Sequence, residues 1–315
     1  MDQPTTVLVF TRESDAPYRK RLIDSGDVRY RFCASEEEIE AQISEADVVL
    51  GSVAFPARLL DRAVRLRWIQ VTGAGVDAFL AQGRLPEGVV LTRVDTSFGD
   101  RIAEYVVGHL LARVLRIQEV YRQQAERRWA PLATRRLCGR TMGIAGTGAI
   151  GRAVAARGRG LGMRTVGLSR SGRRVDAFDW VHPVGALAEF LAGLDVLVLC
   201  LPLTAETRGM IDAEQLACMK PSAILVNVAR GPIVDASALG DALRNGTLAG
   251  AILDVFAQEP LPESSPLWSL DNVTVTSHQA GLNEPDEIVD FFLDNLRRLR
   301  AGEPLRGLVD LRRGY

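Results

Sequence analysis

A glycine-rich turn near the middle of the chain constrains the fold more than any other feature of the sequence. The turn, GTGAIG at Gly146 to Gly151, directly follows an apolar run from Thr141 to Ala145 that has the length of a buried strand. The residues after it carry apolar side chains at helical spacing, at Ile150, Val154 and Leu161. A strand, such a turn and a helix in this order are typical of a dinucleotide-binding unit.

The three glycines of the turn have separate roles in such a unit. Gly146 permits the tight turn, Gly148 lets the backbone approach a pyrophosphate, and Gly151 lets the helix pack closely against the strand. The amides at the start of the helix can then face anionic phosphate. We therefore expect the whole turn to bind the cofactor: Gly146, Thr147, Gly148, Ala149, Ile150 and Gly151.

Length and composition indicate an ordinary two-domain globular protein. The chain has 315 residues, 47% hydrophobic and 24% charged, with a formal net charge of -1. This charge gives no electrostatic argument for a nucleic-acid or membrane partner. The cysteines are scattered without metal-ligand spacing, and neither a basic-then-apolar start nor an apolar run of membrane-spanning length is seen. We therefore predict reduced thiols, no metal site and a cytoplasmic protein.

The first part of the chain alternates short strands and helices, which predicts a parallel α/β domain of its own. The predicted strands are Thr6 to Phe10, Val28 to Phe32, Ala46 to Gly51, Arg67 to Thr72 and Val89 to Val94. Helices are expected between them, around Glu36 to Ser44 and Pro56 to Val64. A long amphipathic helix from about Gly99 to Gln124, capped by Thr96 or Ser97, would then lead into the second domain.

The second part repeats the alternation around the glycine-rich turn. Its predicted strands are Thr141 to Ala145, Arg164 to Leu168, Asp195 to Cys200, Ala223 to Val228, Ala249 to Val255 and Val273 to Ser277. An amphipathic helix after Gly281 ends near Gly302, and it is too short to form a domain, so we expect it to return to the first one.

These observations predict an α/β protein with two Rossmann-like or flavodoxin-like lobes, each a doubly wound parallel sheet, and a cleft between the lobes. Residues 1–97 with 283–315 would form the substrate-binding domain. Residues 98–282 would form a dinucleotide-binding Rossmann domain inserted in it.

Three polar residues follow successive apolar strands of the second domain: Arg230 after AILVNVA, Glu259 after AILDVFAQ and His278 after VTVTS. All strands of a parallel sheet end on one edge, where ligands bind, so these side chains can converge beside a bound nicotinamide. His278 could donate a proton to an alkoxide, while a carboxylate at Glu259 stabilises the charged imidazole and its tautomer. Arg230 could hold and align a substrate carboxylate through a bidentate contact. The set suits reduction of a 2-oxo acid.

The sequence resembles the D-isomer-specific 2-hydroxyacid dehydrogenases over nearly its whole length. In the second domain the likeness rests on His278 and on the motifs GIAGTGAIG, LPLTAET, VNVARG and LDVFAQEP. In the first domain it rests on WIQVTGAGVD at Trp68 to Asp77. Ala103-Glu104 matches the family's Ala-Glu at the crossing helix. Within the family, the closing Gly314-Tyr315 resembles the ends of glyoxylate/hydroxypyruvate reductases. One departure concerns the residue before the histidine: the family usually has Thr-Pro-His, and this chain has Thr276-Ser277-His278, which loosens the backbone there.

The resemblance implies roles for individual residues. Arg230 would bind substrate, Glu259 and His278 would form the proton-transfer pair, and amides near Ala74 and Gly75 would hold the substrate carboxylate. Asp254 is similar to the residue that anchors the carboxamide of nicotinamide. The family motifs place further cofactor contacts at Leu201, Pro202, Thr207, Val228, Ala229 and Gly281.

The turn after the second strand of the dinucleotide unit predicts the cofactor. A site selective for NAD has an acid about 20 residues beyond the glycine motif, which binds the ribose 2′-hydroxyl. Arg170 stands there instead, 19 residues after Gly151. Ser169, Arg170, Ser171, Arg173 and Arg174 could bind a 2′-phosphate, so we predict NADP(H) as the preferred cofactor. The alternative is a solvated basic turn in an enzyme that also uses NAD(H).

We therefore predict a homodimeric enzyme that reduces a small 2-oxo acid, similar to glyoxylate or hydroxypyruvate, to the D-2-hydroxy acid. The hydride would come from C4 of the nicotinamide and the proton from His278. The same residues are compatible with a nucleotide-regulated binding protein resembling the C-terminal-binding corepressors, or with a dehydrogenase of another small anion such as phosphite.

Overall fold

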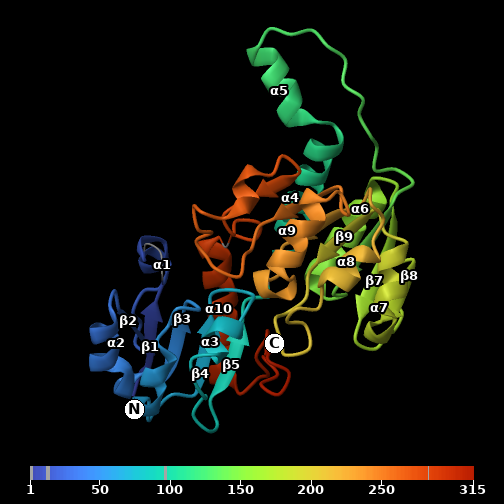
Figure 1. Cartoon of the computed structure of the whole chain (residues 1–315). Coiled ribbons are helices and arrows are strands. Elements are labelled where there is room, and N and C mark those ends of the chain that lie inside the picture. The colour runs from blue at the N-terminus through green and yellow to red at the C-terminus, as the bar shows by residue number, and fades with distance from the viewer. Residues whose placement is uncertain (1–2, 12–14, 96–97, 283) are drawn as a thin grey trace. The chain divides into compact units, whose positions relative to one another are not determined.

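The computed structural model describes residues 3–11, 15–95, 98–282 and 284–315. Contacts divide the chain into two compact units, Met1–Thr96 with Asn283–Tyr315, and Ser97–Leu282. Each unit contains one sheet in which all strand pairs are parallel, with helices between the strands (Figure 1). The predicted α/β class with two parallel sheets is therefore confirmed.

The first unit is built on a five-stranded sheet of order β2-β1-β3-β4-β5. Its strands are β1 (Thr5–Phe10), β2 (Val28–Phe32), β3 (Val48–Gly51), β4 (Trp68–Val71) and β5 (Val90–Arg93). Its helices are α1 (Ala16–Arg21), α2 (Glu36–Gln42), α3 (Asp77–Leu80) and α10 (Pro285–Ala301), with the 3-10 helices η1 (Ile43–Glu45) and η2 (Ala57–Arg62). Thus the helix expected over Pro56 to Val64 is a 3-10 helix.

The last helix of the chain belongs to this first unit. The rings of Trp68 on β4 and Phe292 on α10 stack with centroids 5.1 Å apart, and both side chains are fully buried. Beside them, the buried Asn295 amide donates to the side chain of Gln70 at 3.1 Å. The apolar face of α10 is therefore part of the core of this sheet, and α10 ends at Gly302 in the left-handed conformation that favours glycine.

The second unit has a seven-stranded sheet of order β12-β11-β10-β9-β6-β7-β8. Its strands are β6 (Thr141–Ala145), β7 (Arg164–Ser169), β8 (Trp180–Pro183), β9 (Val196–Leu199), β10 (Ile224–Asn227), β11 (Gly250–Leu253) and β12 (Val273–Val275). Its helices are α4 (Phe98–Val114), α5 (Ile117–Ala125), α6 (Ala149–Gly160), α7 (Leu187–Ala192), α8 (Ala213–Ala217) and α9 (Ala236–Arg244), with η3 (Val184–Ala186), η4 (Gly231–Ile233) and η5 (Pro266–Ser269). The strand order reverses at β6, the position where doubly wound sheets bind nucleotides.

The prediction of one long helix from Gly99 to Gln124 is wrong in one respect: this segment forms two helices, α4 and α5, that meet at Arg116. Arg116 has a φ of 57°, and the carbonyl of Val114 accepts from the amide of Arg135 at 2.9 Å rather than from the next helical turn. A bond from the returning chain thus ends α4. The expected cap at Thr96 or Ser97 lies outside the described residues.

One strand of this sheet was not predicted. No strand was predicted between Arg164 to Leu168 and Asp195 to Cys200, yet Trp180–Pro183 pairs with β7 as the edge strand β8. A four-residue strand that ends in proline has little sequence signal, and an edge position is where proline is tolerated.

Candidate active site

The glycine-rich turn has the shape that phosphate binding requires. Gly146 has a φ of +105°, and a Cβ there would lie 2.6 Å from the carbonyl oxygen of Cys200. A Cβ on Gly151 would lie 1.9 Å from the carbonyl oxygen of Gly146. A Cβ on Gly148 would meet nothing within 4 Å, so the turn is packed on one side and open at its tip.

Helix α6 begins directly behind this open tip. Gly148 is its N-cap, and no side chain caps the helix. The first amides of a helix have no partner within it, and together with the helix dipole they attract anions. The predicted strand, turn and helix are therefore present: Thr147 lies in the turn, and Ala149 and Ile150 are the first residues of α6, whose free amides could bind a pyrophosphate.

The basic turn after β7 is ordered by its own serines. The Ser169 hydroxyl accepts from the amide of Gly172 at 3.1 Å, and the Ser171 hydroxyl accepts from the amide of Arg173 at 3.4 Å. Arg170, Arg173 and Arg174 are exposed. Their guanidinium groups can therefore reach an anion in solvent without breaking a packed core.

A carboxylate that no sequence motif assigned to the cofactor site lies near this turn. Glu206, in the segment after β9, has a lowered pKa because Thr204 donates a hydrogen bond to it and, to a smaller extent, because of the charge of Arg170. The turn itself carries no acid, but a neighbouring loop supplies one. Only the motif LPLTAET marked this loop, and its spacing gave no sign that Glu206 would approach Arg170.

Local hydrogen bonds fix the backbone of the segment after β9 and of the residues after β10. The Thr207 hydroxyl donates to the carbonyl of Pro202 at 2.7 Å, which shapes the turn that also holds Leu201. After β10, the buried Asn227 side chain accepts from the amide of Ala229 and donates to the carbonyl of Arg230, both at 3.1 Å. These two hydrogen bonds span Val228 and fix the backbone from which Arg230 projects.

Arg230 stands in extended backbone at the start of η4, and its guanidinium donates to the carbonyl of Ala229 at 2.7 Å. The next residue, Gly231, lies so close to the 256–257 backbone that a Cβ on it would be 1.9 Å from the carbonyl carbon of Phe256. The turn that carries Arg230 therefore packs against the loop that carries Glu259.

Glu259 and His278 are in direct contact, as the order of the strands predicts. Nδ1 of His278 lies 2.7 Å from Oε2 of Glu259, and Oε1 of the same carboxylate accepts from the amide of Phe256 at 2.8 Å. Because a carboxylate only accepts, Nδ1 carries the proton in this contact. The other ring nitrogen, Nε2, is then the atom that can exchange a proton with a substrate, and half of the His278 side chain is exposed.

Asp254 holds the loop on which His278 sits. Its carboxylate, only 2% exposed, accepts from the Thr276 hydroxyl at 2.6 Å and from the amides of Gln279 and Ala280, both at 2.9 Å. These three hydrogen bonds to the Asp254 carboxylate therefore fix the backbone of residues 276–280. Gly281 continues the loop, and a Cβ on it would lie 3.1 Å from Ile102 of α4.

The predicted residues of the first unit lie after β4, at the corresponding edge of the smaller sheet. Ala74 and Gly75 precede α3 and are partly exposed. The guanidinium of Arg93 donates to the carbonyl of Ala74 at 3.4 Å. The backbone amides of this loop are thus at a strand end, as in other ligand-binding loops of parallel sheets.

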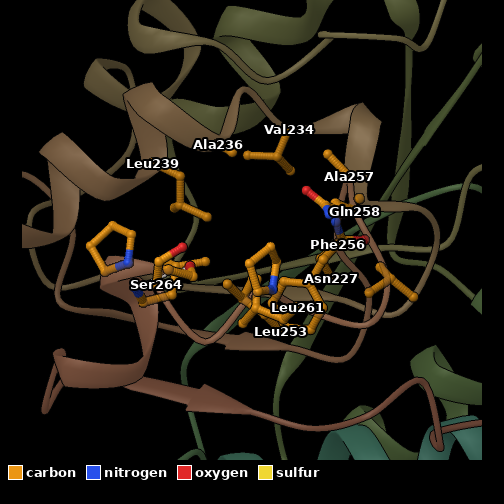
Figure 2. Close-up of a pocket in the computed structure, with 16 residues that line it drawn as sticks. Asn227, Val234, Ala236, Leu239, Leu253, Phe256, Ala257, Gln258, Leu261 and Ser264 are labelled. Atoms are coloured by element: carbon orange, nitrogen blue, oxygen red, sulfur yellow. Dashed lines mark hydrogen bonds between the residues drawn. The ribbon is translucent and has the colours of Figure 1, made fainter.

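A pocket of about 320 Å³ lies beside the loops that carry Arg230 and Glu259 in the second unit and was not predicted (Figure 2). Leu239 of α9 and Phe256, Leu261 and Ser264 of the loop after β11 line it (Figure 2). Gln258 lines this pocket as well, whereas the carboxylate of the next residue, Glu259, contacts His278. The loop after β11 therefore contributes to this pocket and, through Glu259, to the contact with His278.

Two further findings concern the part of the chain that the structure describes. There, no group of three or more histidine, cysteine, aspartate or glutamate side chains could hold a metal ion. None of the helices among residues 3–11, 15–95, 98–282 and 284–315 has the length and apolar character to cross a membrane.

Comparison with known proteins agrees with this geometry. The sequence profile of the D-isomer specific 2-hydroxyacid dehydrogenase, NAD binding domain, matches residues 107–280. Glyoxylate/hydroxypyruvate reductase A of Photorhabdus laumondii is 36% identical over 268 residues, which cover 83% of this chain and 86% of that protein.

Two solved structures with bound cofactor have the same fold over the whole chain. The D-isomer specific 2-hydroxyacid dehydrogenase of Xanthobacter autotrophicus, in complex with NADPH and MES, has a TM-score of 0.87 and 34% identity, covering 99% of this chain and 100% of that one. The NADPH-dependent glyoxylate/hydroxypyruvate reductase of Sinorhizobium meliloti, in complex with NADP and sulfate, has a TM-score of 0.88 and 28% identity with the same coverage. The chain therefore belongs to the family of D-isomer-specific 2-hydroxyacid dehydrogenases.

Proposed function

We propose that this protein reduces a small 2-oxo acid to the D-2-hydroxy acid with NADPH. The observation that carries the proposal is the 2.7 Å contact between His278 and Glu259, on a sheet whose central turn fits a dinucleotide pyrophosphate. When bound, the reduced dinucleotide supplies the hydride that converts the keto carbon into an alcohol carbon. The protein must then supply one proton to the substrate oxygen, because the net change is one hydride and one proton.

In this proposal His278 donates that proton from Nε2, and Glu259 holds the ring through Nδ1 and stabilises the positive charge. Arg230 binds the substrate carboxylate through its planar guanidinium, which also orients the keto group. The amides of Ala74 and Gly75 complete the binding of the same carboxylate. The names of the relatives support glyoxylate and hydroxypyruvate as substrates.

NADP(H) is the preferred cofactor in this account, with NAD(H) as a weaker substitute. The support is the basic turn after β7 and the NADP or NADPH in the related structures. Ser169, Arg170, Ser171, Arg173 and Arg174 would bind the 2′-phosphate. The pyrophosphate would lie on residues Gly146 to Gly151, and the nicotinamide end would lie near Asp254 and Gly281. Further contacts to the cofactor would come from Leu201, Pro202, Thr207, Val228 and Ala229.

We also propose a homodimer formed through α5 and the chain after it, which project from the rest of the second unit (Figure 1). Trp129 is 99% exposed and Tyr121 is 66% exposed, which is costly for large apolar side chains in a monomer. Light scattering should give a dimer for the wild type and a monomer for Trp129→Glu.

The four cysteines are unpaired, which fits a cytoplasmic protein.

The test is a substrate screen with both reduced cofactors. Oxidation of NADPH by glyoxylate or hydroxypyruvate, with the D-acid as product where a stereocentre forms, is the expected result. Tight cofactor binding with no turnover on any acid, together with a nucleotide-dependent protein partner, would replace the proposal with a binding function. Reduction of NADP+ by phosphite, in a parallel assay with the oxidised cofactor, together with no turnover on any 2-oxo acid, would replace it with oxidation of that anion.

A further inference from the structure

A chain of hydrogen bonds connects helix α4 to the loop that carries His278. The hydroxyl of Tyr105 on α4 lies 2.6 Å from the hydroxyl of Thr276. The Thr276 hydroxyl donates to Oδ1 of Asp254 at 2.6 Å. The Asp254 carboxylate then accepts from the amides that directly follow His278, those of Gln279 and Ala280.

The direction of every proton in this chain follows from the groups in it. A carboxylate accepts and does not donate, so the single hydrogen of the Thr276 hydroxyl points to Asp254. Thr276 can then only accept from Tyr105, which must donate. Burial raises the pKa of Tyr105 to about 12, so the phenol keeps its proton at the pH of ordinary assays. Tyr105 is therefore a fixed donor.

The backbone at His278 needs support of this kind. His278 has a φ of 54°, in the left-handed region that side chains with a Cβ rarely adopt. Asp254 holds the backbone at two successive residues: its carbonyl accepts from the amide of His278 at 2.8 Å, and its carboxylate accepts from the amide of Gln279. Ser277, where the family usually has proline, gives no such rigidity of its own.

The Tyr105 ring is itself held in place. The ring of His109, one turn further along α4, packs against it with centroids 4.3 Å apart. At the other end of the loop, Gly281 sits so close to α4 that a Cβ would be 3.1 Å from Ile102. The loop is thus anchored to one helix at both ends, by a hydrogen bond at Thr276 and by close packing at Gly281.

We propose that Tyr105 is a positioning residue for His278, which acts through Thr276 and Asp254 to hold the imidazole against Glu259. This inference rests on the proposed function, in which His278 donates the proton. It assigns to α4 a part in the reaction that no motif of the sequence indicated.

The test removes one hydroxyl at a time. Tyr105→Phe deletes the donor, and the matched control is Tyr30→Phe, which deletes the hydroxyl of a buried tyrosine on β2 of the first unit. We expect kcat for glyoxylate reduction to fall about tenfold in Tyr105→Phe, as for the loss of one buried hydrogen bond. The Kd for NADPH should stay within about twofold, and the solvent deuterium isotope effect on kcat should rise because proton delivery becomes slower.

A second pair of variants guards against a Tyr105→Phe protein that does not fold. Thr276→Val removes the link between Tyr105 and Asp254, and Thr276→Ser restores it. We expect Thr276→Val to lose at least as much kcat as Tyr105→Phe, and Thr276→Ser to recover most of it. A Thr276→Ser protein as impaired as Thr276→Val would overturn the inference.

Amide hydrogen exchange separates failure of this inference from failure of the proposed function, since it requires no turnover. Exchange at residues 277 to 281 should accelerate in Tyr105→Phe and Thr276→Val but not in Tyr30→Phe. If the wild type reduces no 2-oxo acid while exchange changes as expected, the proposed function fails and the support of the loop stands. If the wild type is active and Tyr105→Phe matches Tyr30→Phe in kcat, isotope effect and exchange, Tyr105 does not position His278.

Discussion

Gly231 and Phe256 approach so closely that a methyl group on residue 231 would overlap the Phe256 carbonyl carbon, at 1.9 Å. This contact joins the turn that carries Arg230 to the loop that carries Glu259. The distance between Arg230, the proposed substrate-binding group, and the Glu259–His278 pair is therefore set by contact between two backbone segments, which cannot shift as a flexible side chain can.

The first prediction concerns that contact. Gly231→Ala should separate the two loops, lower kcat/KM for a 2-oxo acid at least tenfold and reduce the free energy of unfolding by about 1–3 kcal/mol, as for overpacked sites. Gly193→Ala is the control, because a Cβ at Gly193 meets nothing within 4 Å and its φ is -90°. Steady-state kinetics and urea unfolding measure both effects. Equal behaviour of the two variants would show that the contact is unimportant.

The glycine-rich turn offers two substitutions with opposite outcomes. Gly148→Ala adds a methyl group in open space, so the fold should keep its stability while the Kd for NADPH rises at least tenfold. Gly151→Ala forces a methyl group onto the Gly146 carbonyl, so its melting temperature should fall. Calorimetry and fluorescence titration with NADPH distinguish the two. Unchanged NADPH affinity in Gly148→Ala would remove the pyrophosphate from this turn.

Cofactor selectivity should depend on Arg170. Replacing it with alanine removes a charged donor for the 2′-phosphate, which NADH lacks, so kcat/KM for NADPH should fall about tenfold or more with little change for NADH. Arg58→Ala, at an exposed arginine of η2, is the control. A parallel loss with both cofactors would place Arg170 elsewhere than at the 2′-phosphate.

Acid stability should depend on Asp195. Burial alone would raise the pKa of this carboxyl, but bonds from the Thr141 amide, Lys220 and Arg140 lower it overall. A group whose folded pKa is lowered stabilises the fold above its unfolded pKa of about 3.9 and loses that contribution as the pH falls through the folded value. Asp195→Asn should therefore unfold more easily than wild type at pH 7.

The difference between Asp195→Asn and the wild type should shrink below about pH 4, in urea titrations at several pH values. Asp176→Asn, at a fully exposed ion pair with Arg174, should show no such pH-dependent difference. A gap between Asp195→Asn and wild type that stays constant down to pH 3 would contradict the assignment.

Elements whose formation depends on residues close together in the sequence could be predicted. The buried strand β6, the turn after it and α6 could be predicted because glycine spacing and apolar periodicity lie within a few residues of one another. The Glu259–His278 contact could be predicted because parallel strands end on one edge of a sheet.

Features set by distant contacts could not be predicted in this way. The end of α4 depends on an amide twenty-one residues further along, at Arg135, which bonds to Val114. The approach of Glu206 to Arg170 joins two loops that follow different strands. Tyr105 has the sequence context of a core residue of a helix, and only the fold brings it to Thr276.

The most direct test of the account is a single-turnover measurement with His278→Gln, at saturating NADPH and glyoxylate. We expect a rate of NADPH oxidation at least a hundredfold below wild type, the usual contribution of a general acid, with the Kd for NADPH unchanged. His182→Gln, at a histidine of β8, should keep the wild-type rate. A wild-type rate in His278→Gln would contradict the assignment of His278 as proton donor.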